Sequence, residues 1–263
     1  MPHVILKRVW DYCAYSKKFL AFIFILLFIS SVFQNYIVSI GDSYEISILN
    51  IVVFISVVGY GMVITRDRIN HGERLPKIEI REIAVLGIKA SLVMVVYILA
   101  QGFLLDFICS PLNFPAFDLE DMLLDWVGLI HRLYSHNLID TIFFLVVGSV
   151  LFYVSSFFME IALARLADTN SILKSFNFLE IKKNIDTIGW INYAKEYTLI
   201  IFVIVFLSYL SAFTFPFSFL DSLVDMFLSF LIFATQYLGI GAVYSKIKDI
   251  ENRVVIPVEG MQE

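Results

Sequence analysis

RDRINHGERLPKIE, residues 66–79, is a charged stretch that separates two long apolar runs, and it decides the fold class of this chain. It holds seven charged residues, a glycine and a proline, and the last two favour a turn. Each flanking run has about twenty mostly apolar residues, which is the length that a helix needs to cross a bilayer. The pattern therefore predicts two membrane helices joined by a loop at the membrane surface.

The composition of the whole chain supports a membrane protein. Of its 263 residues, 59% are hydrophobic and only 16% are charged, whereas a soluble domain has about 45–50% apolar and about 25% charged residues. A core of this size cannot hide so much apolar surface from water. The net charge of −5 does not indicate a nucleic-acid binder. Two cysteines, Cys13 and Cys109, are too few for a disulfide framework or a zinc site.

Windows of about 20 residues predict six transmembrane helices in an all-α, polytopic bundle. We expect a single membrane domain over residues 1–250, followed by a cytoplasmic tail over residues 251–263. Pro216 ends the fifth helix and precedes a short connection to the sixth. The predicted spans are Phe19–Ile40, Ile46–Thr65, Ile83–Leu105, Ile139–Ala164, Tyr197–Pro216 and Leu223–Tyr244.

The basic residues fix the expected orientation. With the N-terminus in the cytoplasm, all of the 19 Lys and Arg residues fall in inner segments except Lys89, within a span, and Arg132, outside. Cytoplasmic loops carry such an excess of Lys and Arg. We therefore expect a multi-pass protein of the cell membrane with both termini in the cytoplasm. Residues 66–79 form its first cytoplasmic loop, in which Gly72 and Pro76 supply the turn.

Two loops carry apolar residues at helical spacing and are predicted to be interfacial amphipathic helices. The first, residues 118–134, is acidic and lies outside; it rests on the outer leaflet, packs on the top of the bundle or acts as a lid. The second lies within the inner segment 165–197, where Asn170 or Ser171 caps a short helix. Its apolar stripe consists of Phe178, Ile181, Ile185 and Ile188.

Ionisable residues within membrane helices are the first functional candidates. Lys89 and Glu160 lie at similar depths from the inner ends of the third and fourth spans. They form a structural pair, Lys89 extends to the inner surface, or both line a transport pathway. Basic residues of the first loop either contact lipid headgroups or only set the topology: Arg66, Arg68, Arg74 and Lys77. We expect no catalytic residue, no cofactor and no metal site, because the sequence has no nucleotide-binding or metal-helix motif.

Three blocks of the sequence are similar to a known family. The block "GYGMVITRDRINHGERLPKIEIREIAVLGIKASLVMVVYIL" resembles the signature of the integral-membrane domain of unknown function 4013, mostly archaeal. The later segments "EIALARLADTNSILKSFNFLEI" and "LGIGAVYSKIKD" resemble its second block and its close, so the resemblance extends over roughly residues 10–250. It implies a polytopic membrane protein and no particular activity. The residues that carry the first block are Gly59, Tyr60, Arg66, Gly72, Glu73, Leu75, Pro76, Gly87 and Lys89.

Together these features favour a non-enzymatic membrane scaffold or accessory subunit that contacts lipid headgroups. One alternative is a small transporter or permease that uses Lys89 and Glu160. Another is a lipid-modifying membrane enzyme that uses the acidic outer residues. The expected partners are the lipid bilayer and either another protein or a second copy of the chain, whereas no nucleic acid is expected. A water-filled cavity at Lys89 and Glu160 distinguishes the transporter from the scaffold.

Overall fold

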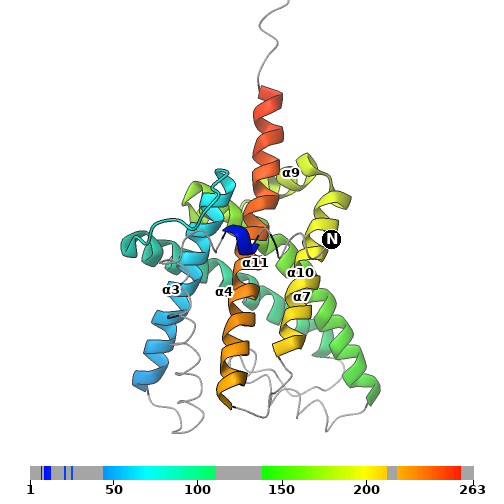
Figure 1. Ribbon diagram of the computed structural model, residues 1–263. Helices are drawn as coiled ribbons and strands as arrows, with labels where there is room; N and C mark the ends of the chain where they lie inside the picture. Colours follow the sequence, from blue (N-terminus) through cyan, green and yellow to red (C-terminus); the bar gives the residue numbers. More distant parts are fainter. Residues whose placement is uncertain are drawn as a thin grey trace, which may run out of the picture. The chain divides into compact units, whose positions relative to one another are not determined.

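The computed structural model describes residues 7, 9–12, 21, 25, 44–110, 138–211 and 218–255 (Figure 1). Within these residues the secondary structure is helical and contains no strand, which confirms the all-α class. The helices are α3 (Tyr44–Ile69), α4 (Ile80–Cys109), α7 (Leu138–Thr169), α8 (Ile172–Ser175), α9 (Phe178–Ile188), α10 (Trp190–Ser211) and α11 (Ser218–Val255).

The chain forms two compact units. Unit 1 consists of Met1–Ser91 and Ile161–Glu263, and unit 2 of Leu92–Glu160. Within unit 1, α11 packs against both α3 and α10 and lies between them, and α9 packs beside α11 (Figure 1). Within unit 2, Leu105 and Cys109 of α4 pack with Phe144 of α7. The helices α4 and α7 each contribute residues to both units.

Four helical segments are long and apolar enough to cross a membrane: Ile80–Cys109, Thr141–Thr169, Trp190–Ser211 and Val224–Asn252. They contain most of the third to sixth predicted spans. The second predicted span, residues 46–65, lies within α3, and the first, residues 19–40, lies almost entirely outside the described residues. The predicted outer helix 118–134 also lies outside them. The number of six spans therefore stays a prediction.

The surfaces of these helices indicate a membrane protein. No more than half of the most apolar stretch of each helix is buried within the protein. Large apolar side chains such as Phe103 and Phe107 on α4 and Ile139 on α7 are exposed. Contiguous exposed apolar surface of this kind is rare in soluble monomers, and it suits contact with lipid chains.

The helices extend beyond the predicted spans at several boundaries. The largest differences are at α10, which begins at Trp190 rather than at Tyr197, and at α11, which continues to Val255 rather than ending at Tyr244. The predicted end of the membrane domain at residue 250 stays a prediction. A helix of 38 residues is about 57 Å long at 1.5 Å per residue, whereas the apolar core of a bilayer is about 30 Å thick. Apolar windows detect only the part of a helix that suits lipid, and they miss the polar turns that continue it.

The end of α3 corrects the predicted role of Gly72. The residue in the left-handed region is His71, with φ 61°, and not the glycine. The Gly72 N–H donates to Asp67 O at 2.8 Å and the His71 N–H donates to Arg68 O at 3.1 Å, which is the Schellman arrangement of helix ends. A Cβ at Gly72 would collide with the Asp67 carboxylate, so the glycine leaves space for that side chain.

Glycines allow α3 and α4 to approach closely within unit 1. A Cβ at Gly59 would meet the backbone carbonyl of Ile83, and a Cβ at Gly87 would meet that of Ile55. Small residues permit such backbone contact between membrane helices. On the other side of α3, Thr65 Oγ1 donates to Tyr237 O of α11 at 3.0 Å. Gly59 and Gly87 thus let the backbones of α3 and α4 come into direct contact.

Candidate functional site

The last turns of α7 lie in the centre of unit 1. Every residue from Ile161 to Ala167 is buried, including Arg165. The alanines at 162, 164 and 167 occupy little volume, so neighbouring helices can surround this segment. The helix ends at Asn170, whose φ of 56° suits an asparagine at a helix C-terminus. We call the charged side chains around this segment, together with the polar groups that they bond to, the polar network. Its members are Arg66, His71, Glu82, Lys89, Arg165, Asp168, Asn170, Glu180, Asn184, Tyr244, Lys248 and Asp249.

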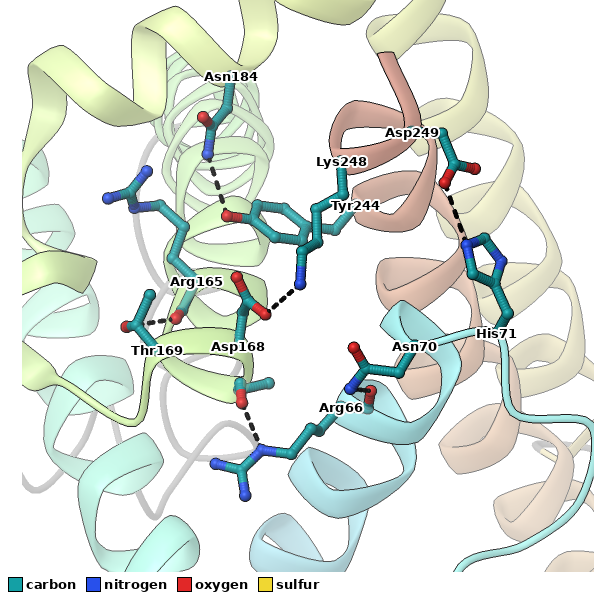
Figure 2. Close-up of polar contacts among 11 residues, drawn as sticks. Arg66, Asn70, His71, Arg165, Asp168, Thr169, Asn184, Tyr244, Lys248 and Asp249 are labelled. Atoms are coloured by element: carbon teal, nitrogen blue, oxygen red, sulfur yellow. Dashed lines mark hydrogen bonds and ion pairs between the residues drawn. The ribbon is translucent and has the colours of Figure 1, made fainter. Parts of the chain in front are cut away.

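Arg66 of α3 connects three helices in this network. Its Nε donates to Ala167 O of α7 at 2.6 Å, and its guanidinium pairs with Glu82 in the first turn of α4. Figure 2 shows Arg66 pointing from α3 toward the end of α7. The side chain is 26% exposed, and the bonds to protein partners occupy its charged end. For Arg66 the sequence left two possibilities, a contact with lipid headgroups or a role in topology alone, and both stay predictions; the partners that the structure describes are Ala167 and Glu82.

Arg165 is the most buried cation of the network, with its side chain 7% exposed. It pairs with Glu180 of α9, and its Nε donates to Lys174 O at 3.1 Å. With the Asn184 amide turned by 180°, the Asn184 oxygen accepts from Arg165 Nη1 at 3.1 Å. A buried charge needs such partners, because it has lost its contacts with water. Arg165 therefore fixes α8 and α9 against the end of α7.

Helix α11 joins the network through its polar turns (Figure 2). Lys248 Nζ donates to Asp168 Oδ1 of α7 at 2.6 Å. Tyr244 and Asn184 are both buried, and the Tyr244 hydroxyl lies 3.4 Å from the Asn184 side-chain amide. His71 Nε2 lies 3.1 Å from Asp249 Oδ1 at the exposed edge. These contacts explain why α11 stays attached to unit 1 beyond its most apolar stretch.

Lys89 is held at the end of α7. Its Nζ donates to both Asn170 O at 2.8 Å and Asn170 Oδ1 at 2.9 Å. Glu160 is buried, with an exposed fraction of 5%, and it belongs to unit 2, whereas Lys89 belongs to unit 1. The expected pair between Lys89 and Glu160 therefore stays a prediction. The partner that the structure describes for Lys89 is Asn170.

The other predicted headgroup contacts differ in their surroundings. Arg74 and Lys77 are exposed in the loop between α3 and α4. Arg68 is partly buried, and its Nη1 donates to Gly72 O at 3.2 Å. Of the four predicted basic residues, Arg74 and Lys77 are thus the two that are exposed on the surface, whereas Arg66 and Arg68 are partly buried.

A cavity of about 540 Å³ lies beside the polar network, within unit 1. Its apolar lining comes mainly from α10 and α11, and we call the five charged residues of the lining its rim: Asp11, Arg68, Glu73, Glu196 and Lys246. The volume is within the range of about 300–1,000 Å³ that is usual for small-molecule sites. The lining residues are Val9, Asp11, Tyr12, Arg68, Glu73, Glu196, Leu199, Ile200, Leu238, Gly239, Ala242, Val243 and Lys246.

Sequence reasoning did not identify Arg165, Asp168, Tyr244 or the cavity as parts of a site. One signal was present: on α11 the cavity-lining residues 238, 239, 242, 243 and 246 recur at helical spacing and lie on one face. Three of them, Gly239, Ala242 and Val243, are small enough to leave space. Among the described residues, no three His, Cys, Asp or Glu side chains are placed to hold a metal ion.

The family model described as "Protein of unknown function (DUF4013)" matches residues 45–217. No curated protein and no solved structure shows a significant match to the chain. The matched range contains Arg66, Lys89, Arg165 and their partners on α4, α7, α8 and α9. It covers more than half of the 263 residues and agrees with the resemblance noted in the sequence. The chain therefore belongs to the DUF4013 family, whose function is unknown.

Proposed function

We propose that this protein is a non-enzymatic membrane scaffold or accessory subunit with six spans and both termini in the cytoplasm. One observation carries the proposal: cations near the helix ends bond to groups on other helices. Arg66 joins α3 to α4 and α7, Arg165 joins α7 to α9, and Lys248 joins α11 to α7. Charges used in this way hold a bundle together, whereas a transport pathway needs charged groups that face water.

The connection between α7 and α10 supplies a surface for lipid headgroups. Large apolar side chains on it are exposed, with Leu173 at 85% and Leu179 at 82%, next to the exposed lysines Lys174, Lys182 and Lys183. Both flanking helices are candidate spans, so the connection lies where the chain leaves and re-enters the membrane. Apolar side chains that enter the interface and lysines that face anionic headgroups are typical of interfacial segments. Arg74 and Lys77, exposed in the loop between α3 and α4, are further cations that headgroups can reach.

The role of Lys89 is tested by a double-mutant cycle with Asn170. Lys89→Met and Asn170→Gly are each expected to destabilise the protein, because either substitution removes the charge-assisted hydrogen bond between the Lys89 ammonium group and the Asn170 side chain. Glycine retains the left-handed backbone at residue 170, so the substitution removes the amide without adding strain. We expect a coupling energy of about 0.5–1 kcal/mol. Reversible unfolding of the purified protein in detergent micelles measures it, with the exposed Lys77→Met as the control.

The transporter alternative rests on Glu160, a buried carboxyl group within a candidate span. It predicts that Glu160→Gln abolishes a proton flux that the intact protein produces in proteoliposomes. The scaffold proposal predicts the same flux in both preparations as in protein-free liposomes. Additive energies for Lys89 and Asn170, together with a flux that needs Glu160, would reject the scaffold. The third alternative, a lipid-modifying enzyme, depends on the outer acidic residues. Asp106 is exposed on α4, whereas those of the predicted outer helix 118–134 lie outside the described residues.

The proposed orientation is tested at His71, whose side chain is 64% exposed in the loop after α3. In a variant without Cys13 and Cys109, His71→Cys is expected to react with a membrane-impermeant maleimide only after the cells are permeabilised. Ser135→Cys, in the predicted outer segment, is the control and is expected to react in intact cells. Labelling of residue 71 in intact cells would contradict the cytoplasmic position of the loop.

A further inference from the structure

We propose that the cavity of unit 1 binds one zwitterionic phospholipid, with its phosphate at Arg68, its ammonium group at Asp11 and Glu73, and an acyl chain on the apolar lining. The proposal rests on the proposed function to the extent that both place unit 1 in contact with lipid. It adds a ligand class and a site that the scaffold role does not require.

The apolar part of the cavity suits an acyl chain. Leu199 and Ile200 of α10 line it together with Leu238 and Val243 of α11. Ala242 lines the same space with a single methyl group. Gly239 keeps the two helices close, because a Cβ there would press on the Ile200 side chain. The part of the cavity that lies between these two candidate spans is thus lined by aliphatic side chains.

Arg68 supplies the group that recognises phosphate. A guanidinium has five N–H donors, and Gly72 O accepts one of them, from Nη1. Within the described part of the chain, no other acceptor bonds to the Arg68 guanidinium. The remaining donors can form paired hydrogen bonds to phosphate oxygens, which a guanidinium matches in geometry.

The other charges at the rim favour a zwitterion over an anionic lipid. Lys246 Nζ donates to Glu196 Oε1 at 2.6 Å, so these two charges compensate each other. Arg68 then shares the rim with two carboxylates, Asp11 and Glu73. A purely anionic headgroup would meet a rim that is negative in sum. A headgroup that carries both a phosphate and a primary ammonium has a partner for each sign.

The polarity of the cavity also changes in the direction that a lipid requires. On α10 the lining runs from Glu196 to Ile200, and on α11 it runs from Lys246 back to Leu238. In both helices it therefore passes from a charged residue at the polar-network end to apolar residues further into a candidate span. A phospholipid seated with its headgroup at Arg68 places its chain toward the bilayer.

Native mass spectrometry of the full-length protein in detergent tests the site, with phosphatidylethanolamine, phosphatidylglycerol or inorganic phosphate added. We expect one tightly retained phosphatidylethanolamine, bound about 10-fold more tightly than phosphatidylglycerol, which corresponds to about 1.4 kcal/mol. Arg68→Met, which removes the phosphate donors, and Ala242→Phe, which fills the apolar part, are each expected to weaken binding at least about 10-fold. Arg81→Met, which removes an exposed cation outside the cavity, is the matched control and should bind as the unaltered protein does.

Several results would overturn the proposal. Equal retention of both lipids would reject the role of the two carboxylates. Unchanged lipid binding in Ala242→Phe would reject the proposed position of the acyl chain. Displacement of the lipid by an equal concentration of inorganic phosphate would show that the acyl chain contributes nothing to binding. If Ala242→Phe does not give a monodisperse protein, Leu199→Gln tests the apolar lining instead. The maleimide pattern at His71 is independent of lipid retention, so failure of the orientation and failure of the site are distinguishable.

Discussion

Gly59→Val is expected to destabilise the protein by about 3 kcal/mol, because the new side chain collides with backbone that cannot rotate away. A Cβ at this position meets the carbonyl of Ile83, and Gly87 lies on the other side of the same crossing. The two helices α3 and α4 must therefore separate, which also weakens the pair between Arg66 and Glu82. Denaturant titration of the purified protein in micelles measures the loss.

Gly148→Ala is the matched control for this prediction. Gly148 also lies in a long helix, but a Cβ there comes no nearer than 3.9 Å to the Leu105 side chain, which is an ordinary contact. Alanine is favoured over glycine within helices by about 1 kcal/mol, so Gly148→Ala is expected to be neutral or stabilising. Equal losses in both variants would contradict the close approach of α3 and α4.

Glu180→Ala is expected to destabilise the protein by about 3 kcal/mol, the lower end of the range for breaking a buried ion pair. The substitution leaves the Arg165 guanidinium buried without its carboxylate, and the remaining acceptors, Lys174 O and Asn184, are neutral. The loss is at the low end because Glu180 itself is 49% exposed. Thermal unfolding followed by circular dichroism should show a lower Tm, and limited proteolysis should cut within α8 or α9 sooner.

Two variants control for Glu180→Ala. Glu180→Gln retains an oxygen acceptor for Arg165 and is expected to lose about half as much stability. Lys182→Ala changes an exposed residue on the same helix and is expected to alter stability by less than about 0.5 kcal/mol. A Tm for Glu180→Ala that equals that of Lys182→Ala would show that Arg165 does not depend on this carboxylate.

The membrane helices were predictable because length and apolarity are local properties of the sequence. The predicted spans 83–105 and 139–164 lie within α4 and α7, and the apolar parts of α10 and α11 were also found. The ends of helices were less predictable. Residues 190–196 form the first turns of α10, and a window that searches for apolar residues misses them because several of them are polar. The burial of Ile181, Ile185 and Ile188 agrees with the predicted stripe, whereas its fourth member, Phe178, is exposed.

Much of the polar network was not predictable, because several of its pairs are far apart in the sequence. Lys89 and Asn170 are separated by 81 positions, and Asp168 and Lys248 by 80. Depth in the membrane suggested Glu160 as a partner for Lys89, but depth alone does not say which acceptor the side chain reaches. Ser171 illustrates the same limit: it is the N-cap residue of α8, as expected, but its side chain makes no capping bond. Asn177, which was not considered, caps α9 by accepting from the Glu180 N–H at 3.3 Å.

Because α11 is continuous, it can transmit motion along its whole length. Sharp kinks in a helix occur at a proline, a glycine–serine pair, a π-bulge or an inserted group, and the 38-residue sequence of α11 contains neither a proline nor a glycine–serine pair. Torque applied near Val255, by another protein for example, would therefore rotate the rod as one body. Gly241 packs closely against Arg68, and Gly239 against Ile200, so the helix has little room to turn at these two contacts. Motion at its C-terminal end would therefore first displace the contacts of α11 with α3 and α10.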